Sequence, residues 1–457
     1  MLLLALLACT PPDDTDKPAR DDTAADTDTD DTDTDTEETD TDDTDDTDDT
    51  DTAGDTDTDT DTAPPPVDAD ADGYTADVDC DDANAAVNPG VASDPCNGID
   101  DDCDGTYEED SAGPAAWHGG VAYTSLAEAL ARTEAGDTVG LCPGTYTGTW
   151  SVAEPVILEG WARDPARTIL DGNGAGPVLG VSDIVDRPDA VGFAYLTVRN
   201  GVADRGGALY AYAANVRVTN SVLENNTGRV GGAIAAISSE SVNVTDSTLQ
   251  DNVATDAGGA IYVEGSRLDT VTLTTTGSTY ARNAAAEEGG AIGATFYGYG
   301  NVNPQSSVFD ENTAGTSGGA VAIAIVKNLF FNSGSSTFTG NVAGDVAGAV
   351  WVYSDLYAEL NTGSASFTDN SAAAGAGAVY VEAPTAVLNA SGTWHRNVAA
   401  DGSCAGVGGY GEIEGDWGTG ADENLGCDVS LSVCEQVRTD LGAGTDVQCR
   451  PDGSWTE

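Results

Sequence analysis

Apolar and small residues recur at a regular spacing between about Asn200 and Asn397. In each copy an apolar residue stands three positions before an asparagine, and in the first six copies a step of two small residues, an alanine and an aliphatic residue follows it. The seven asparagines are Asn226, Asn252, Asn283, Asn312, Asn341, Asn370 and Asn397. From Asn283 to Asn370 they are 29 residues apart. A repeat of this length predicts stacked units, because one unit is too small to bury its own apolar face.

After each small-residue step the sequence alternates between apolar and polar positions, as in AIYVEG and AVWVYSD. Alternation indicates a β-strand with one buried face. The positions expected inside are Ile261, Val263, Val321, Ile323, Val350, Val352, Val379 and Val381. The outward positions carry Tyr262, Glu264, Trp351, Tyr353, Tyr380 and Glu382. The paired small residues fit a tight corner where a larger side chain would clash.

The recurring asparagine is expected at another corner of each turn. An asparagine side chain can bond backbone groups of its own turn and of the next one. We therefore interpret the seven asparagines as a structural ladder.

The segment before the repeats predicts a short helix and then a strand. Ser125 caps the helix in the sequence SLAE, and Glu128 reaches back three positions. The helix is expected to end near Ala135–Gly136, with a strand over Asp137–Leu141. The phrase AYTSLAEALARTEAGDTVGLCPGTY resembles the N-terminal cap and first turn of the pectin-lyase-like right-handed β-helix. This resemblance implies an all-β fold: a right-handed parallel β-helix, or solenoid, over residues 114–400 with a short N-terminal capping helix.

Charge narrows the possible partners. The chain carries 79 acidic and 16 basic residues, for a formal net charge of −63. Nucleic acid is excluded as a partner because like charges repel. Residues 10–66 consist mostly of Asp and Thr and have almost no apolar residue, so we predict a disordered stalk that repulsion extends.

Nine cysteines fall into three places. Cys9 follows an apolar run that starts at Leu2, and residues 1–9 look like a bacterial lipoprotein signal peptide. This resemblance implies export and a lipid on Cys9; an ordinary apolar N-terminus is the alternative. Export implies an oxidising compartment. The disulfide candidates are Cys80, Cys96, Cys103, Cys142, Cys404, Cys427, Cys434 and Cys449. Two bridges at each end is the simplest pairing, with residues 401–457 as a cysteine-rich C-terminal cap.

Residues 67–113 contain two acidic loops. In DADADGYTADVD the positions of an EF-hand-like loop are filled by Asp68, Asp70, Asp72, Gly73, the Tyr74 carbonyl and Asp79. In IDDDCDG the same spacing recurs at Asp100, Asp102, Asp104 and Gly105. Oxygen ligands at this spacing suit Ca²⁺. No helix precedes the first loop, so it is not a true EF-hand, and an acidic linker is the alternative.

The two loops and their cysteines are together similar to a metal-binding motif repeat of bacterial surface proteins, and to thrombospondin type 3 and dockerin calcium loops. The resemblance implies a calcium-binding module. We expect the ion to be structural, because it would hold together a module with a very small core.

Catalytic residues are not evident. The two histidines, His118 and His395, stand at opposite ends of the predicted solenoid, and the arginines of the repeats are scattered. No dyad or triad emerges. We therefore favour a noncatalytic protein, with a pectin-lyase-like polysaccharide lyase or hydrolase as the alternative.

Outward aromatic residues offer a binding face. Trp351, Tyr353 and Tyr380 belong to adjacent turns, and exposed rings pack well on sugars. Simple packing on the surface is the alternative.

The repeat itself resembles those of chlamydial polymorphic outer-membrane proteins, which are surface-displayed adhesins. Together the patterns predict an exported monomer, lipid-anchored to the bacterial outer membrane or cell surface. It would touch the membrane through its N-terminal lipid only and contact extracellular polysaccharide or a cell-surface component.

Overall fold

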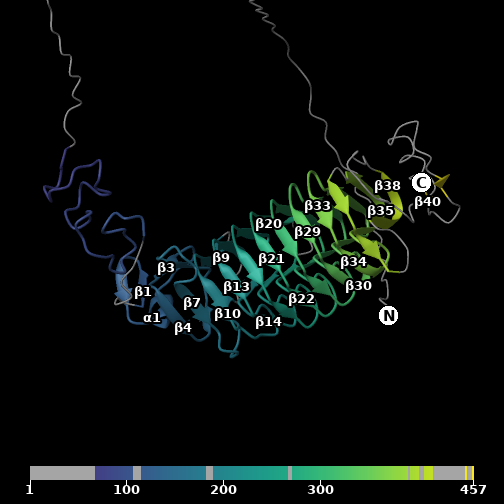
Figure 1. The fold of residues 1–457 in the computed structure, drawn as a ribbon. Helices are drawn as coiled ribbons and strands as arrows, with labels where there is room; N and C mark the ends of the chain where they lie inside the picture. Colours follow the sequence, from purple (N-terminus) through teal and green to yellow (C-terminus); the bar gives the residue numbers. More distant parts are fainter. Residues whose placement is uncertain are drawn as a thin grey trace, which may run out of the picture. The chain divides into compact units, whose positions relative to one another are not determined.

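The computed structural model describes residues 67–106, 115–181, 189–265, 270–389, 392–400, 406–414, 448–449 and 455–456. These ranges form short strands that pair in parallel from one turn to the next, with a single short helix among them. Figure 1 shows the turns following one another in sequence order. The chain is therefore an all-β solenoid, as predicted. No helix within the same ranges is long and apolar enough to cross a membrane.

Two columns of parallel strands make up most of the largest sheet, which has 21 strands. The first column contains β5 (Trp150–Val152), β8 (Leu179–Val181), β11 (Leu209–Tyr212), β15 (Ile234–Ile237), β19 (Ile261–Glu264), β23 (Ile292–Phe296), β27 (Val321–Ile325), β31 (Val350–Ser354) and β35 (Val379–Asn389). The second contains β6 (Ile157–Gly160), β9 (Ala190–Ala194), β12 (Asn215–Thr219), β16 (Ser241–Thr245), β20 (Thr270–Thr276), β24 (Tyr299–Gln305), β28 (Asn328–Asn332) and β32 (Tyr357–Asn361). The long strand β35 pairs with both β31 and β32.

Two further parallel sheets complete each turn. One has ten strands: β4 (Gly144–Thr147), β7 (Thr168–Asp171), β10 (Thr197–Arg199), β13 (Val222–Glu224), β17 (Thr248–Gln250), β21 (Thr279–Ala281), β25 (Val308–Asp310), β29 (Thr337–Thr339), β33 (Ser366–Thr368) and β36 (Thr393–His395). The other has seven: β14 (Thr227–Gly228), β18 (Val253–Ala254), β22 (Ala284–Ala285), β26 (Thr313–Ala314), β30 (Val342–Val346), β34 (Ser371–Ala374) and β37 (Val398–Ala399). The repeat that contains β19, β20, β21 and β22 thus contributes one strand to each of the two columns and one to each of the two smaller sheets.

The interior is filled from two directions. The aliphatic residues predicted to face inward, from Ile261 to Val381, are all buried, which confirms the alternation. Opposite them, the residue three positions before each asparagine forms an internal stack of rings in the later turns: Tyr280, Phe309, Phe338, Phe367 and Trp394. Adjacent ring centroids in this stack lie 4.2–4.8 Å apart. Stacked rings add attraction to the free energy of burial.

The paired small residues form a corner between consecutive turns, as predicted. Gly289 has a φ of +66°, a conformation that favours glycine. A Cβ on Gly290 would lie 2.1 Å from the Gly319 carbonyl oxygen of the next turn. The first glycine is therefore required by backbone conformation, and the second by the close approach of the neighbouring turn.

The seven asparagines lie in one buried column. From Asn226 to Asn370, each side-chain Nδ2 donates to Oδ1 of the asparagine in the next turn, at 2.9–3.1 Å. The same Oδ1 also accepts the backbone N–H of the preceding asparagine, at 3.0–3.1 Å. Each Nδ2 further donates to a carbonyl of the preceding turn, as Asn312 does to Tyr280 O at 2.9 Å. The column joins the turns along the solenoid.

The entry segment comprises β1 (Ala116–His118), β2 (Val121–Tyr123), α1 (Leu126–Leu130) and β3 (Thr138–Leu141). Ser125 caps α1 as predicted, since its Oγ accepts the Glu128 N–H at 3.3 Å. The Glu128 carboxylate, however, accepts from the Thr124 hydroxyl. The helix also ends at Leu130, before the predicted Ala135–Gly136, because the Asp137 carboxylate takes the Glu134 N–H and starts the turn into β3.

At the other end, β38 (Val407–Glu414) pairs with β35, and β39 (Gln448–Cys449) pairs antiparallel with β40 (Trp455–Thr456). The predicted signal peptide with Cys9, the stalk, and Cys404, Cys427 and Cys434 lie outside the described residues.

Candidate metal centre

The first acidic loop wraps its aspartates around its own backbone. Asp68 accepts the N–H groups of Ala71 and Gly73, at 2.7 and 3.1 Å. Asp70 accepts from Asp72 N at 3.2 Å, and Asp72 accepts from Tyr74 N at 2.9 Å. The Tyr74 carbonyl stays a predicted ligand, because these bonds involve only its N–H. These bonds hold the three carboxylates on the same side of a tight backbone turn.

The second loop repeats this pattern. Asp100 accepts from Gly105 N at 3.1 Å, as Asp68 does from Gly73. Asp102 accepts from Asp104 N at 3.2 Å, and Asp104 from Thr106 N at 2.7 Å. The sixth position of each loop has a positive φ, +105° at Gly73 and +87° at Gly105, which explains the glycine there. Two loops with the same conformation are therefore present.

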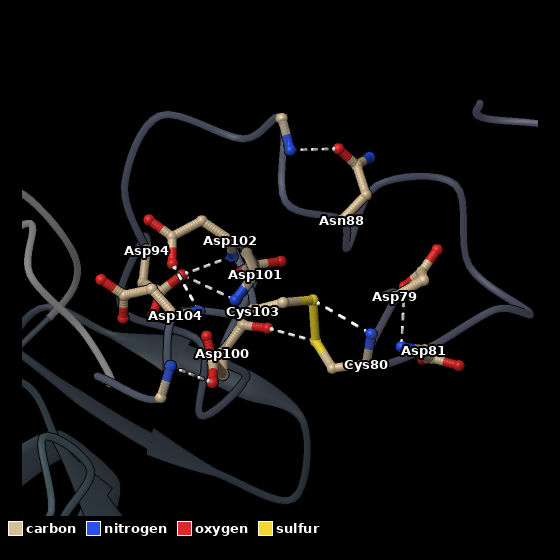
Figure 2. Close-up of a disulfide and its surroundings, with 12 residues drawn as sticks. Asp79, Cys80, Asp81, Asn88, Asp94, Asp100, Asp101, Asp102, Cys103 and Asp104 are labelled. Atoms are coloured by element: carbon tan, nitrogen blue, oxygen red, sulfur yellow. Dashed lines mark hydrogen bonds between the residues drawn. A yellow bond between two sulfur atoms is a disulfide. The ribbon is translucent and has the colours of Figure 1, made fainter. Parts of the chain in front are cut away.

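Each loop gathers a carboxylate cluster. Oxygens of Asp68, Asp70 and Asp72 lie within 4.8 Å of one another. A second group within the same distance consists of Asp94, Asp100 and Asp102 (Figure 2). Buried carboxylate oxygens without a hydrogen-bond partner belong to Asp70, Asp72, Asp79 and Asp100. Buried carboxylate oxygens need a proton, a hydrogen-bond donor or a cation, so these atoms fit a bound metal ion.

Asp94 is a candidate metal ligand that the spacing of the acidic loops does not identify. It is fully buried, and its Oδ1 accepts the backbone N–H groups of Asp101 and Asp102, at 2.6 and 3.0 Å. It stands six residues before Asp100, whereas an EF-hand-like loop places its last ligand after the loop. No motif in the sequence marks it, and only the folded chain brings it to the second loop.

Asp79 and Asp104 are placed differently from the other predicted ligands. Asp79 is buried beside Cys80 and Cys103, and its Oδ1 accepts from Asp81 N at 2.9 Å. In the view of Figure 2 it lies across the disulfide from Asp94, Asp100 and Asp102. The exposed Asp104 is absent from the cluster that contains Asp94.

Two disulfides hold the module together and attach it to the solenoid. Cys80 bonds Cys103, which links the two loops, and Cys96 bonds Cys142, directly after β3. The sulfurs of Cys80 and Cys103 are therefore not thiolate ligands. Disulfides among the four N-terminal cysteines are thus confirmed, whereas the structure describes no pairing for Cys449 in β39.

The electrostatics of the first loop favour a cation. Burial of the Asp70 carboxyl group raises its pKa, and the negative charges of Asp72, Asp79 and Asp68 raise it further. The hydrogen bond from the Asp72 N–H lowers the pKa, but by less than the other effects raise it. A divalent cation would offset this repulsion. The donor set consists of carboxylate oxygens, which suits a hard cation such as Ca²⁺ or Mg²⁺.

Several arginines of the described turns form ion pairs. Arg199 pairs with Asp171, Arg282 with Asp251 and Arg396 with Asp369, each pair joining neighbouring turns. Arg229 contacts both Asp204 and Asp256, at 3.0 and 2.7 Å. His118 contacts Asp137 at 2.8 Å, and His395 ends β36 at the far end of the solenoid. The histidines thus stay far apart in the fold.

The predicted aromatic face lies on β31 and β35. Trp351 pairs in register with Tyr380, and Tyr353 with Glu382. The rings of Trp351 and Tyr353 lie 6.3 Å apart, and Trp351 Nε1 donates to Glu382 at 3.2 Å. Tyr353 is 40% exposed, whereas Trp351 and Tyr380 are partly buried. The structure brings the three rings together on the outer surface.

Two family models match parts of the chain. Residues 79–109 match a family labelled Cu-binding MopE and described as "Putative metal-binding motif". This match contains the second loop, whereas the first loop precedes it except for Asp79, at which the match begins. Residues 246–264 match the "Chlamydia polymorphic membrane protein (Chlamydia_PMP) repeat", and they include Asn252 and the corner Gly258–Gly259. Comparisons with curated proteins and with solved structures found no match.

Proposed function

We propose that this protein is a noncatalytic, surface-displayed β-solenoid whose N-terminal module is stabilised by calcium. One observation carries the proposal: the same loop conformation occurs twice, and both loops hold buried carboxylate oxygens that lack a hydrogen-bond donor. Asp68, Asp70 and Asp72 would hold one ion, and Asp94, Asp100 and Asp102 a second. The role is structural, because the ligands belong to a module without a sizeable core of its own.

Calcium fits the donor set better than copper does. Copper sites in proteins favour imidazole and sulfur ligands. The two carboxylate clusters contain no histidine, and the sulfurs beside them are joined in a disulfide. Ca²⁺ accepts six to eight oxygen ligands in a flexible arrangement, so backbone carbonyls and water can complete each site.

Surface display is supported by the resemblance of the repeat to a polymorphic membrane protein repeat. A lipid on Cys9 would anchor the chain to the outer membrane, and the acidic stalk would extend the solenoid away from it. The solenoid would then contact polysaccharide or a cell-surface component. We take its winding to be right-handed, because crossover connections between parallel strands nearly always have that hand.

Metal removal tests this proposal. Calorimetry on the purified protein compares its melting temperature in EDTA with that after addition of calcium, magnesium or copper. We expect calcium to give the largest increase, since a ligand at about a hundred times its Kd stabilises the folded state by about 2.7 kcal/mol. The variant Asp70→Asn should respond less than Asp77→Asn, which alters an exposed aspartate. An unchanged melting temperature in calcium, or a response to copper alone, contradicts the proposal.

Polysaccharide cleavage is the alternative, and one contact favours it. Asp256 and Glu287 lie on neighbouring turns, and the interaction with the Asp256 carboxyl group raises the pKa of Glu287. Burial, followed by the charges of Glu287 and Asp256, raises the pKa of Glu288. Paired carboxyl groups with raised pKa values serve as acids in glycoside hydrolysis. Release of reducing ends or unsaturated sugars by the wild type, and its loss in Glu287→Gln, would establish the alternative.

A further inference from the structure

We infer that the outer face of β24, β28 and β32 binds a neutral polysaccharide chain, through aromatic rings that are framed by amide and carboxylate groups. This inference rests on the proposed display function, for which it names the ligand class and the surface. It extends the face formed by Trp351, Tyr353 and Tyr380 to the neighbouring strand column.

The strand register sets the composition of this face. Phe330 pairs with Asn301 on one side and with Glu359 on the other, so these three side chains share one outward row. Asn328 pairs with Tyr357 in a second row, and Tyr299 stands at the corresponding position of β24, one residue before the Gly300–Leu329 pair. A third row continues from Asn332 to Asn361 and Asn389. Rings thus alternate with amide or carboxylate groups in the first two rows, and the third row consists of amides.

The rings are exposed although the solenoid has an interior that accepts aromatic side chains. Tyr299 and Phe330 are each 44% exposed. Leu356 and Val326, in the turns that lead into β32 and β28, are also exposed. The Phe330 and Tyr357 rings meet edge to face with centroids 6.4 Å apart. A contiguous group of exposed apolar side chains on a monomer indicates a binding surface.

Polar groups of the face are held in place by local contacts. Tyr357 donates from its hydroxyl to Glu359 at 3.1 Å, and Tyr353 to Asp355 at 2.8 Å. Asn332 and Asn361 accept the N–H groups of Gly334 and Gly363, which orients their amides. Fixed amide and carboxylate groups bond hydroxyls, while flat rings pack on the apolar faces of sugars. The face therefore offers both contacts that a pyranose ring requires.

Charge selects a neutral ligand. Asp355, Glu359 and Glu382 border the rings, and Lys327 lies over the Tyr299 ring at 4.8 Å. The chain as a whole carries a net charge of −63. Uronate and sulfated polymers would be repelled by this field. A linear polymer suits the surface, because equivalent positions recur along the solenoid at about 4.8 Å.

Affinity electrophoresis of the purified protein in gels that contain barley β-glucan, glucomannan, dextran, polygalacturonate or chitosan tests the inference. We expect at least one neutral polymer to retard the wild type. The double variant Tyr299→Ala/Phe330→Ala should lose at least ten-fold in affinity, while Tyr212→Ala, which removes a similarly exposed ring on β11, should not. Melting temperatures check that both variants remain folded, since all three rings lie on the surface.

Three results would overturn the inference: no retardation by any neutral polymer, equal retardation of the wild type and the double variant, or retardation by polygalacturonate or chitosan alone. The calcium response of the melting temperature is measured on the same samples. Binding without a calcium response would contradict the proposed metal module only. A calcium response without binding would contradict this inference only.

Discussion

Asn312 donates an amide hydrogen to Oδ1 of Asn341 in the next turn, and its backbone N–H reaches the same oxygen, both at 3.0 Å. Its own Oδ1 accepts the equivalent pair from Asn283. Both side chains are fully buried. Each asparagine therefore satisfies polar groups of the turns on both sides, where no water can replace it.

Replacement of Asn312 by alanine should lower the free energy of unfolding by about 1–3 kcal/mol, because it leaves buried groups such as Asn283 N and Tyr280 O without partners. Chemical denaturation measures the change. Asn243→Ala, which alters an exposed asparagine on β16, should have little effect. Equal effects of the two substitutions would show that the ladder contributes no stability of its own.

The internal ring stack makes a second prediction. Phe338 lies between Phe309 and Phe367, with centroids 4.7 Å away on each side. Phe338→Ala should destabilise the protein by about 3–5 kcal/mol, since it leaves a cavity in a packed interior. Phe330→Ala, on the outer face of β28, should stay within about 0.5 kcal/mol of the wild type. Denaturation of both variants under the same conditions checks the contrast.

Asp94→Asn tests the ligand that the sequence pattern missed. Asparagine keeps an oxygen for the N–H groups of Asp101 and Asp102 but lacks the negative charge. We expect calcium titration, followed by intrinsic fluorescence or calorimetry, to show one site weakened at least ten-fold and the other unchanged. The exposed Asp81→Asn serves as the matched control. Two unchanged sites would remove Asp94 from the metal centre.

Loss of the Cys96–Cys142 disulfide should uncouple the module from the solenoid. The two cysteines are 46 residues apart, and closing a loop of that length is worth about 4 kcal/mol in the chain-entropy model. Cys96→Ser/Cys142→Ser should lower the melting temperature and reduce the stabilising effect of calcium on the solenoid. Circular dichroism melts with and without calcium measure both. An undiminished calcium effect would mean that other contacts couple the two parts.

Stability should also respond to pH through Glu287. Its pKa in the folded protein lies above the ordinary value of 4.5, so the folded state loses stability as pH rises from below 4.5 through the folded pKa. Glu287→Gln avoids this loss. The variant should be more stable than the wild type at neutral pH by ~0.3 kcal/mol, a value discounted for solvent screening, and equal to it at about pH 3.

Glu311→Gln is the control for this pH dependence. The Glu311 carboxylate acts attractively on Arg282, so the change should not stabilise the protein at neutral pH. Melting curves at several pH values compare the three proteins. A Glu287→Gln advantage that persists at low pH would show that repulsion between carboxylates is not its cause.

The sequence by itself determined the solenoid, because its contacts follow from the period. In a parallel stack the residue one repeat later is the spatial neighbour. The spacing of Asn283, Asn312 and Asn341 therefore implied their contact, and alternation identified the interior. The acidic loops could also be predicted from the sequence, because their contacts are local: Asp68 with Gly73 and Asp100 with Gly105 each lie within six residues of chain.

Contacts that no short spacing encodes were decided only by the tertiary structure. Asp94 joins Asp100 because the chain folds back on itself, and the segment after α1 turns toward β3 because the Asp137 carboxylate accepts the Glu134 N–H. The exposure of Tyr299 and Phe330 depends on which face of β24 and β28 turns outward, and the period-two pattern is too mixed there to show it. Interactions between residues that are close in sequence or one repeat apart can be predicted from the sequence. Contacts between distant segments, and the exposure of an aromatic ring, depend on the rest of the fold.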